Sequence, residues 1–222
     1  MKLIKIPEDR YYEYKIQAMF DCYKWDPQFC DSNTLSKHIL ILTQKENEEI
    51  IKLTKSLDKE TRLAEEYLNQ NRKLVKKLAL PKQILEQIPN MQTYDKTQNI
   101  RLMRYDFHPS TDNHWVVTEV NSDCPGGFAE SSLLPDIARK MINMPELEYH
   151  SFGEKMVDTI NNKLNKKGTI MMVHCTCFSD DRQVMQYLGD RLEKEGYKII
   201  YGAADHIRFK EKKAYCILDN NQ

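Results

Sequence analysis

A long run of helical periodicity between Thr43 and Pro81 constrains the fold more than any other feature of this sequence. Thr43 and Glu46 have the spacing of a capping box, so the run has a defined start. Apolar side chains then recur at three- and four-residue spacing through Leu78, with lysines and glutamates between them. We expect one long amphipathic helix, or two in tandem, that ends before Pro81.

The pattern changes from helical to extended after a short helical segment that follows Pro81. Residues 100–108 and 115–121 are rich in β-forming side chains, and turn-forming residues separate them at 109–113. These segments predict an antiparallel β-hairpin.

The C-terminal part of the chain predicts a strand at 169–173, a helix at 180–195 and a second strand at 197–201, with Gly196 placed to end the helix. This order is typical of a βαβ unit with parallel strands and a right-handed crossover.

The predicted fold class is therefore α/β. We expect residues 1–165 to form an α+β part with the long helix and the hairpin, and residues 166–222 to form a second domain built on the βαβ unit.

Composition narrows the classes of partner. Lysine plus arginine and aspartate plus glutamate balance at 33 each, so no overall field favours nucleic acid or an anionic membrane. No apolar stretch approaches the roughly 20 residues that span a bilayer, and the charged start at 1–14 does not resemble a signal peptide. We expect a cytoplasmic globular protein that binds neither nucleic acid nor membrane.

Six cysteines in a chain of 222 residues are too sparse for a disulfide-stapled secreted domain, so we interpret them as reduced thiols. Cys175 and Cys177 form a C-x-C pair beside His174, which could supply thiolate ligands to zinc. No second ligand pair at finger-like spacing follows, so we interpret the pair as residues at the end of a strand.

The segments RYDFH and TEVNSD carry the candidate chemistry. Because side chains alternate along a strand, Arg104, Asp106 and His108 share one face of the first strand, and Glu119 and Asn121 share one face of the second. Two carboxylates and an amide oxygen form the oxygen-only site that Mg²⁺ prefers. The arginine beside them could hold a transferring phosphoryl group.

The opposite faces of both strands are expected to pack against the rest of the protein. These faces carry Met103 and Tyr105 on the first strand, and Val116, Thr118 and Val120 on the second. The same alternation also fits polar residues on the solvent face of an ordinary hairpin, and the residues alone do not decide between the two interpretations.

The run R-x-D, a turn, and E-x-N followed by a small loop and a helix resembles the metal-binding hairpin of glutathionylspermidine synthase and related circularly permuted ATP-grasp proteins. The later run HCTCFSDDRQVMQYLGDRLEKEGYKIIYGAADHIRF is similar to their pre-ATP-grasp segment. The similarity extends from about Arg101 to the C-terminus. It implies that Asp106, Glu119 and Asn121 are Mg²⁺ ligands and that Arg104 contacts phosphate.

The resemblance further implies an ATP- and Mg²⁺-dependent ligase that phosphorylates a carboxylate for attack by an amine. The substrate would be a small molecule or peptide with an amine acceptor. Ser122, Asp123 and Glu130 lie just beyond the metal motif and could contact this substrate, although Asp123 fits equally well as a turn residue. The loop at 124–127, Cys-Pro-Gly-Gly, departs from the threonine- and serine-containing loop of glutathionylspermidine synthase, which leaves the substrate open. In the permuted order the lysine-bearing strands that close over ATP lie farther along, so we expect the chain alone to lack the ATP clamp and to be inactive.

Two other classes of function stay open at this point. A metal-dependent nuclease also places an aspartate and a Glu-x-Lys on adjacent strands, although Asn121 stands where that lysine would be. A non-catalytic domain that binds a peptide or a partner chain is the other alternative.

Overall fold

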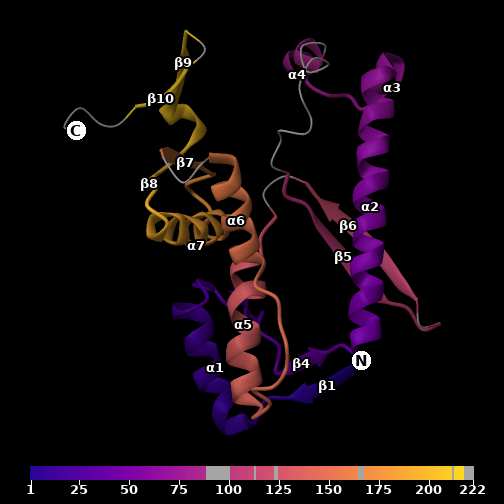
Figure 1. Ribbon diagram of the computed structural model, residues 1–222, viewed down its shortest axis with the longest axis vertical. Helices are drawn as coiled ribbons and strands as arrows, with labels where there is room; N and C mark the ends of the chain where they lie inside the picture. The colour runs from indigo at the N-terminus through magenta and orange to yellow at the C-terminus, as the bar shows by residue number, and fades with distance from the viewer. Residues whose placement is uncertain (89–100, 113, 123–124, 165–167, 212, 218–222) are drawn as a thin grey trace. The chain divides into compact units, whose positions relative to one another are not determined.

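The computed structural model describes residues 1–88, 101–112, 114–122, 125–164, 168–211 and 213–217 (Figure 1). It mixes helices and strands, which confirms the α/β class. The chain divides into two compact units. One comprises Met1 and Leu42–Ser122, and the other comprises Lys2–Ile41 and Asp123–Gln222.

The division into 1–165 and 166–222 expected from the sequence differs from these units. Its boundary falls at residues outside the described part of the chain, so it stays a prediction. Across the described ranges, no helix combines the length and apolar character needed to cross a membrane.

The first unit is built on the predicted long helix. Its helices are α2 (Gln44–Gln70), α3 (Arg72–Lys77) and α4 (Lys82–Gln87). The helical run is thus two helices in tandem, interrupted at Asn71, and a third short helix follows Pro81.

The start of α2 is fixed by the predicted capping box. The Thr43 hydroxyl accepts from the Glu46 amide at 3.3 Å, and the Glu46 carboxylate accepts from the Thr43 amide at 2.8 Å. The Met1 ammonium also binds this carboxylate. That hydrogen bond, followed by those from Thr43, lowers the pKa of Glu46 to about 2.

The hairpin of the first unit consists of β5 (Arg104–Pro109) and β6 (Trp115–Asn121), which pair antiparallel. The first predicted strand therefore begins a few residues later than expected, and the second has the predicted bounds. The hairpin turn is closed by the Ser110 amide, which donates to the His114 carbonyl at 2.8 Å.

The second unit joins an N-terminal segment to the C-terminal part of the chain. Its elements up to residue 41 are β1 (Lys2–Lys5), α1 (Glu8–Phe20), β2 (Gln28–Phe29), β3 (Ser32–Asn33) and β4 (His38–Ile41). Strands β1 and β4 pair antiparallel, as do β2 and β3. Helix α1 packs beside α5 (Phe128–Met141), and the two helices enclose a hydrophobic cluster that includes Ile6, Ala18 and Met141.

Three helices of the second unit meet around Tyr187, which is fully buried. They are α5, α6 (Phe152–Leu164) and α7 (Ser179–Lys194). The Tyr187 ring lies edge-on to Tyr23 and tilted to Phe128, and the Arg191 guanidinium covers it at 3.7 Å from the ring centroid. This packing holds α7 against α5 and α6.

The predicted βαβ unit is present. Strands β7 (Thr169–Val173) and β8 (Lys198–Gly202) pair in parallel, with α7 as the connection. Gly196 follows the helix with φ +97°, a left-handed conformation that favours glycine. A short 3₁₀ turn, η3 (Ala204–His206), leads into a second hairpin of β9 (Ile207–Lys210) and β10 (Lys213–Cys216).

The contact between Gly153 of α6 and Tyr187 of α7 yields a stability prediction. A Cβ atom at Gly153 would lie 1.9 Å from the Tyr187 hydroxyl oxygen, and the buried ring has no room to withdraw. We expect Gly153→Ala to lower the free energy of unfolding by about 1–3 kcal/mol in urea denaturation. Gly126→Ala, where no atom lies within 4 Å of the added carbon, is the matched control and should leave it unchanged. Equal stability of the two variants would contradict this description of the core.

Candidate functional site

The four side chains predicted to carry the chemistry lie on one face of the β5–β6 hairpin. Asp106 and Glu119 are directly opposite each other, and Arg104 and Asn121 form the next pair on the same face of the hairpin. Residues that face each other across an antiparallel ladder project to the same side, so the register alone brings these groups together.

Hydrogen bonds connect all four groups. The Arg104 guanidinium donates to both oxygens of Asp106, at 2.7 Å from Nε and 3.0 Å from Nη2, and Nη2 also donates to Glu119 at 3.2 Å. The Asn121 amide donates to the same Glu119 oxygen. The structure therefore places the predicted residues in one polar cluster, with Arg104 between the two carboxylates.

A β-bulge lies next to the cluster. Asp106 pairs with Glu119 but Phe107 pairs with Val117, which leaves Thr118 as an extra residue of β6. The Thr118 hydroxyl donates to the Asp106 carbonyl at 3.2 Å, so the bulge contacts the strand that carries the aspartate. No glycine or other sequence signal marks this position, and sequence analysis did not predict it.

The bulge changes which face is occupied by the residues of β6 that precede it, on the turn side of the hairpin. Val116 lies opposite His108, on the face of Asp106, so the prediction that it would share the reverse face with Val120 was wrong. The extra residue shifts the alternation by one, and this is the physical reason. Val116 and Val120 are also both exposed, at 49% and 42%, so they do not form the expected buried layer.

The other face of β5 contacts α2, as predicted for Met103 and Tyr105. The Tyr105 hydroxyl lies 3.3 Å from the Thr61 hydroxyl of α2 and 3.6 Å from the Met103 sulfur. Just before the strand, Arg101 pairs with Glu65 of the same helix. These contacts join the base of the hairpin to α2 and leave the polar cluster on the opposite side.

The cluster is charged and open to solvent. The hydrogen bond from Arg104 is the largest cause that lowers the pKa of Asp106, so this carboxylate is ionised well below neutral pH. The side chains of Arg104, Asp106 and Glu119 are 41%, 31% and 56% exposed. An ion pair this exposed contributes about 0–1 kcal/mol, so a cation of higher charge can compete with the guanidinium for the oxygens.

The donor set fits Mg²⁺ by its chemistry. Asp106 and Glu119 offer carboxylate oxygens, and Asn121 would present its amide oxygen, whereas here the amide nitrogen donates to Glu119. No group of three or more histidine, cysteine, aspartate or glutamate side chains within the described ranges is arranged to hold a metal ion. The hairpin set has two carboxylates, so a cation there would take its remaining ligands from water and phosphate, which is the usual situation for Mg²⁺.

Two of the three candidate substrate residues lie in the described part of the chain. Ser122 is exposed directly after β6, and Asp123 lies outside the described residues. Glu130 is in the first turn of α5 in the other unit, where its carboxylate pairs with Lys24 at 3.4 Å. Their role as substrate contacts stays a prediction.

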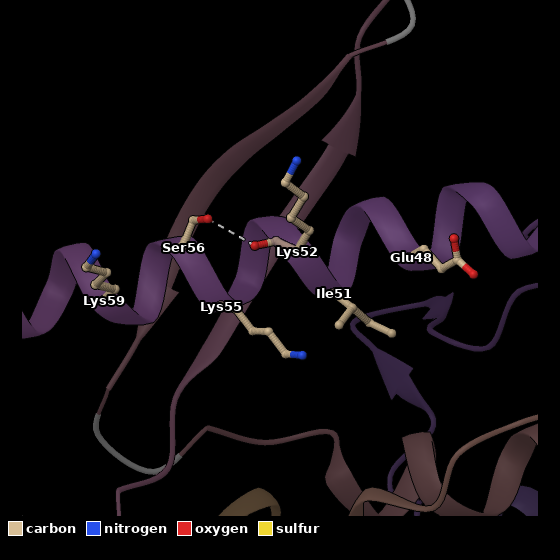
Figure 2. Close-up of a pocket in the computed structure, with 6 residues that line it drawn as sticks. All are labelled: Glu48, Ile51, Lys52, Lys55, Ser56 and Lys59. Atoms are coloured by element: carbon tan, nitrogen blue, oxygen red, sulfur yellow. Dashed lines mark hydrogen bonds between the residues drawn. The ribbon is translucent and has the colours of Figure 1, made fainter.

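A surface hollow of about 370 Å³ lies on α2, and Figure 2 draws the residues that line it. It is lined by Glu48, Ile51, Lys52, Lys55, Ser56 and Lys59. The side chains of Lys52 and Lys55 point away from each other in this view, and the Ser56 hydroxyl donates to the Lys52 carbonyl at 3.1 Å. All six residues come from one helix face, and none belongs to the hairpin cluster. The hollow therefore does not provide convergent groups for catalysis.

Comparison with known proteins identifies the family. The model of the family described as glutathionylspermidine synthase pre-ATP-grasp matches residues 14–222, so the chain belongs to this family. A search of curated proteins gives no match. The matched range begins far before Arg101, where the similarity was expected to start, and it includes residues 14–41 and α2 as well as the hairpin. The circular permutation and the metal-binding role of the hairpin stay predictions.

The Arg104–Asp106 pair yields an electrostatic prediction. We expect Arg104→Gln to raise the pKa of Asp106 towards its ordinary value, because the largest cause of its lowering is removed. A carboxylate with a lowered pKa stabilises the fold fully above its unfolded-state pKa and loses this contribution as pH falls through its folded-state pKa. The variant should therefore show a smaller loss of stability on acidification below pH about 4.

The measurement is an NMR titration of the Asp106 carboxyl carbon. The control is Arg62→Gln, which breaks a comparable exposed pair with Asp58 on α2 and should leave the Asp106 titration unchanged. An unchanged Asp106 pKa in Arg104→Gln would show that the guanidinium does not hold this carboxylate in solution.

Proposed function

We propose that this chain forms part of an ATP- and Mg²⁺-dependent ligase of the glutathionylspermidine synthase type, which joins a carboxylate to an amine. The relation to ATP-grasp ligases follows from the family match over residues 14–222. The finer proposal rests on one observation above all. Asp106 and Glu119 face each other on the hairpin, with Arg104 and Asn121 as the adjacent pair.

Each residue has a proposed role in phosphoryl transfer. Asp106 and Glu119 supply negative oxygens at fixed spacing, and the Asn121 amide oxygen completes the set. Arg104 hydrogen-bonds to both carboxylates. In the proposal it would contact the transferring phosphoryl group, whose charge spreads over its oxygens. When bound, Mg²⁺ would neutralise phosphate charge and orient the phosphate oxygens. Catalysis would be positioning and charge stabilisation, without a nucleophile from the protein.

Arg104 would exchange partners during this reaction. In the structure its guanidinium occupies the carboxylate oxygens that a metal ion needs. Because the pair is exposed and weak, moving the guanidinium from carboxylate to phosphate costs little free energy. Until the metal and phosphate arrive together, the arginine would offset the repulsion between the two carboxylates.

The substrate is proposed as a small molecule or peptide whose carboxylate is phosphorylated and then attacked by an amine. Ser122, Asp123 and Glu130 remain the candidate contacts, since they follow the hairpin in the chain. A ligase that consumes ATP would work in the cytoplasm, which is the location that we propose. The family match gives no support to the nuclease alternative.

The proposed metal site is tested by Mn²⁺ as a paramagnetic substitute. We expect Mn²⁺ to broaden the amide NMR signals of the hairpin around Asp106, Glu119 and Asn121 first. Asp106→Asn and Glu119→Gln should weaken this binding at least about 10-fold, since even outer-shell changes at metal sites cost that much.

Asp112→Asn is the matched control for this experiment. Asp112 lies in the turn of the same hairpin and binds the Ser110 hydroxyl, so its loss should not change Mn²⁺ binding at the strands. Broadening centred on another part of the chain, or unaffected by Asp106→Asn, would contradict the metal assignment.

The 222-residue chain alone is expected to bind Mg-ATP weakly or not at all and to show no ATP-dependent ligation. Its four site residues come from one open hairpin and can hold only one side of a Mg-phosphate complex. Isothermal titration with Mg-ATP and an ADP-release assay over peptide and polyamine substrates measure this. Micromolar binding abolished by Asp106→Ala would show that the chain holds more of the site than proposed, and steady turnover would show that it is a complete ligase.

A further inference from the structure

The turn between β7 and α7 carries two exposed thiols in contact. The Sγ atoms of Cys175 and Cys177 are 3.3 Å apart, and both cysteines are free. A disulfide has an S–S distance of about 2.05 Å. A small rotation of the two side chains would bring the sulfur atoms to this distance. Spacing in sequence alone does not place two thiols so close, because the backbone between them must turn.

The backbone around the two thiols is held in that turn from both sides. The Phe178 amide donates to the Cys175 carbonyl at 3.1 Å, which closes a four-residue turn over Cys175–Phe178. The His174 amide donates to the Gly202 carbonyl at 3.1 Å and so extends the pairing with β8. The Asp181 carboxylate of α7 accepts from the Cys175 amide at 3.2 Å.

The chemistry of the pair favours a disulfide over a metal site. Zinc sites in proteins use at least three protein ligands. Among residues with described positions, no three histidine, cysteine, aspartate or glutamate groups are arranged to bind a metal. The adjacent His174 is 8% exposed, and its Nδ1 lies 3.2 Å from the Met172 carbonyl, so this ring is directed into the protein.

We propose that Cys175 and Cys177 form a dithiol site that reacts with low-molecular-weight disulfides and closes an intramolecular disulfide. In the first step, the thiolate of one cysteine attacks a sulfur of the small disulfide and releases one small thiol, which leaves a mixed disulfide. In the second step, the other cysteine loses its proton, attacks the protein sulfur of the mixed disulfide and releases the second small thiol. The protein is oxidised by two electrons, and the small disulfide is reduced to two thiols.

The surroundings assign an order to the two cysteines. The hydrogen bond with Cys177 is the largest cause that raises the pKa of Cys175, and nearby Asp181 acts in the same direction. The Asp181 carboxylate, which accepts from the Cys175 amide, places negative charge beside Cys175 and disfavours its thiolate, so in the proposal Cys177 attacks first. Cys175 then resolves the mixed disulfide. This site is independent of the hairpin cluster and of the proposed ligase function.

The oxidation is tested with hydroxyethyl disulfide as the probe and intact-mass spectrometry as the readout. We expect the Cys175 and Cys177 pair of the wild-type chain to lose two hydrogens without retaining an adduct, and peptide mapping to find the bond between these two cysteines. Cys175→Ser should instead accumulate a stable hydroxyethyl adduct on Cys177. Cys30→Ser removes an exposed lone thiol that can itself retain an adduct, and it should leave the bond between Cys175 and Cys177 unchanged, which makes it the matched control.

Binding of phenylarsine oxide, which bridges two neighbouring thiols, gives a second readout without oxidation. We expect both Cys175→Ser and Cys177→Ser to weaken this binding about 100-fold. In either variant the arsenic can bond to only one thiol of the site, so the gain from a second bond within the same molecule is lost. Persistent adducts on both cysteines of the wild type, or a mapped disulfide from either to a different cysteine, would overturn the proposal. So would equal arsenical binding by the wild type and the two variants.

Discussion

The pairing of Asp106 with Glu119 across the β5–β6 hairpin determines the other relations at the candidate site. This register places Arg104 beside Asn121, and it brings the guanidinium within hydrogen-bonding distance of both carboxylates. A slip of one residue would direct the two carboxylates to opposite faces. The bulge at Thr118, bonded to the Asp106 carbonyl, lies directly beside this pair and changes the alternation only on the turn side of it.

The two units have different physical characters. The second unit has a hydrophobic cluster around α1 and α5 and a second packed region around Tyr187, so its elements are fixed by burial. The first unit depends more on polar contacts, since α2 contains no buried residue and the hairpin valines are exposed. The pair Arg101–Glu65 and the contact between Tyr105 and Thr61 join the hairpin to α2. A site that must rearrange around a metal and phosphate is compatible with such a lightly packed support.

The sequence predicted those parts of the fold that depend on local periodicity. The capping box at Thr43, the two strands of the hairpin, the parallel βαβ unit and the helix end at Gly196 were confirmed. It did not predict the pairing of β1 with β4, because these strands are four residues long and their association depends on burial of Ile6 against a helix more than 100 residues away.

Alternation correctly grouped the four polar side chains of the hairpin, but it failed for Val116 because a bulge is decided by three-dimensional packing. The contact between Cys175 and Cys177 likewise depends on a turn that the C-x-C spacing does not specify.

The central claim is that one face of this hairpin binds a divalent cation. Anomalous diffraction from crystals soaked in Mn²⁺ tests it most directly, because it locates the ion without reference to activity. The account predicts one anomalous peak about 2.0–2.3 Å from oxygens of Asp106 and Glu119, with the Asn121 amide oxygen turned towards it and Arg104 displaced from Asp106. A hairpin that keeps Arg104 paired with both carboxylates in saturating Mn²⁺, with no peak beside them, would contradict it.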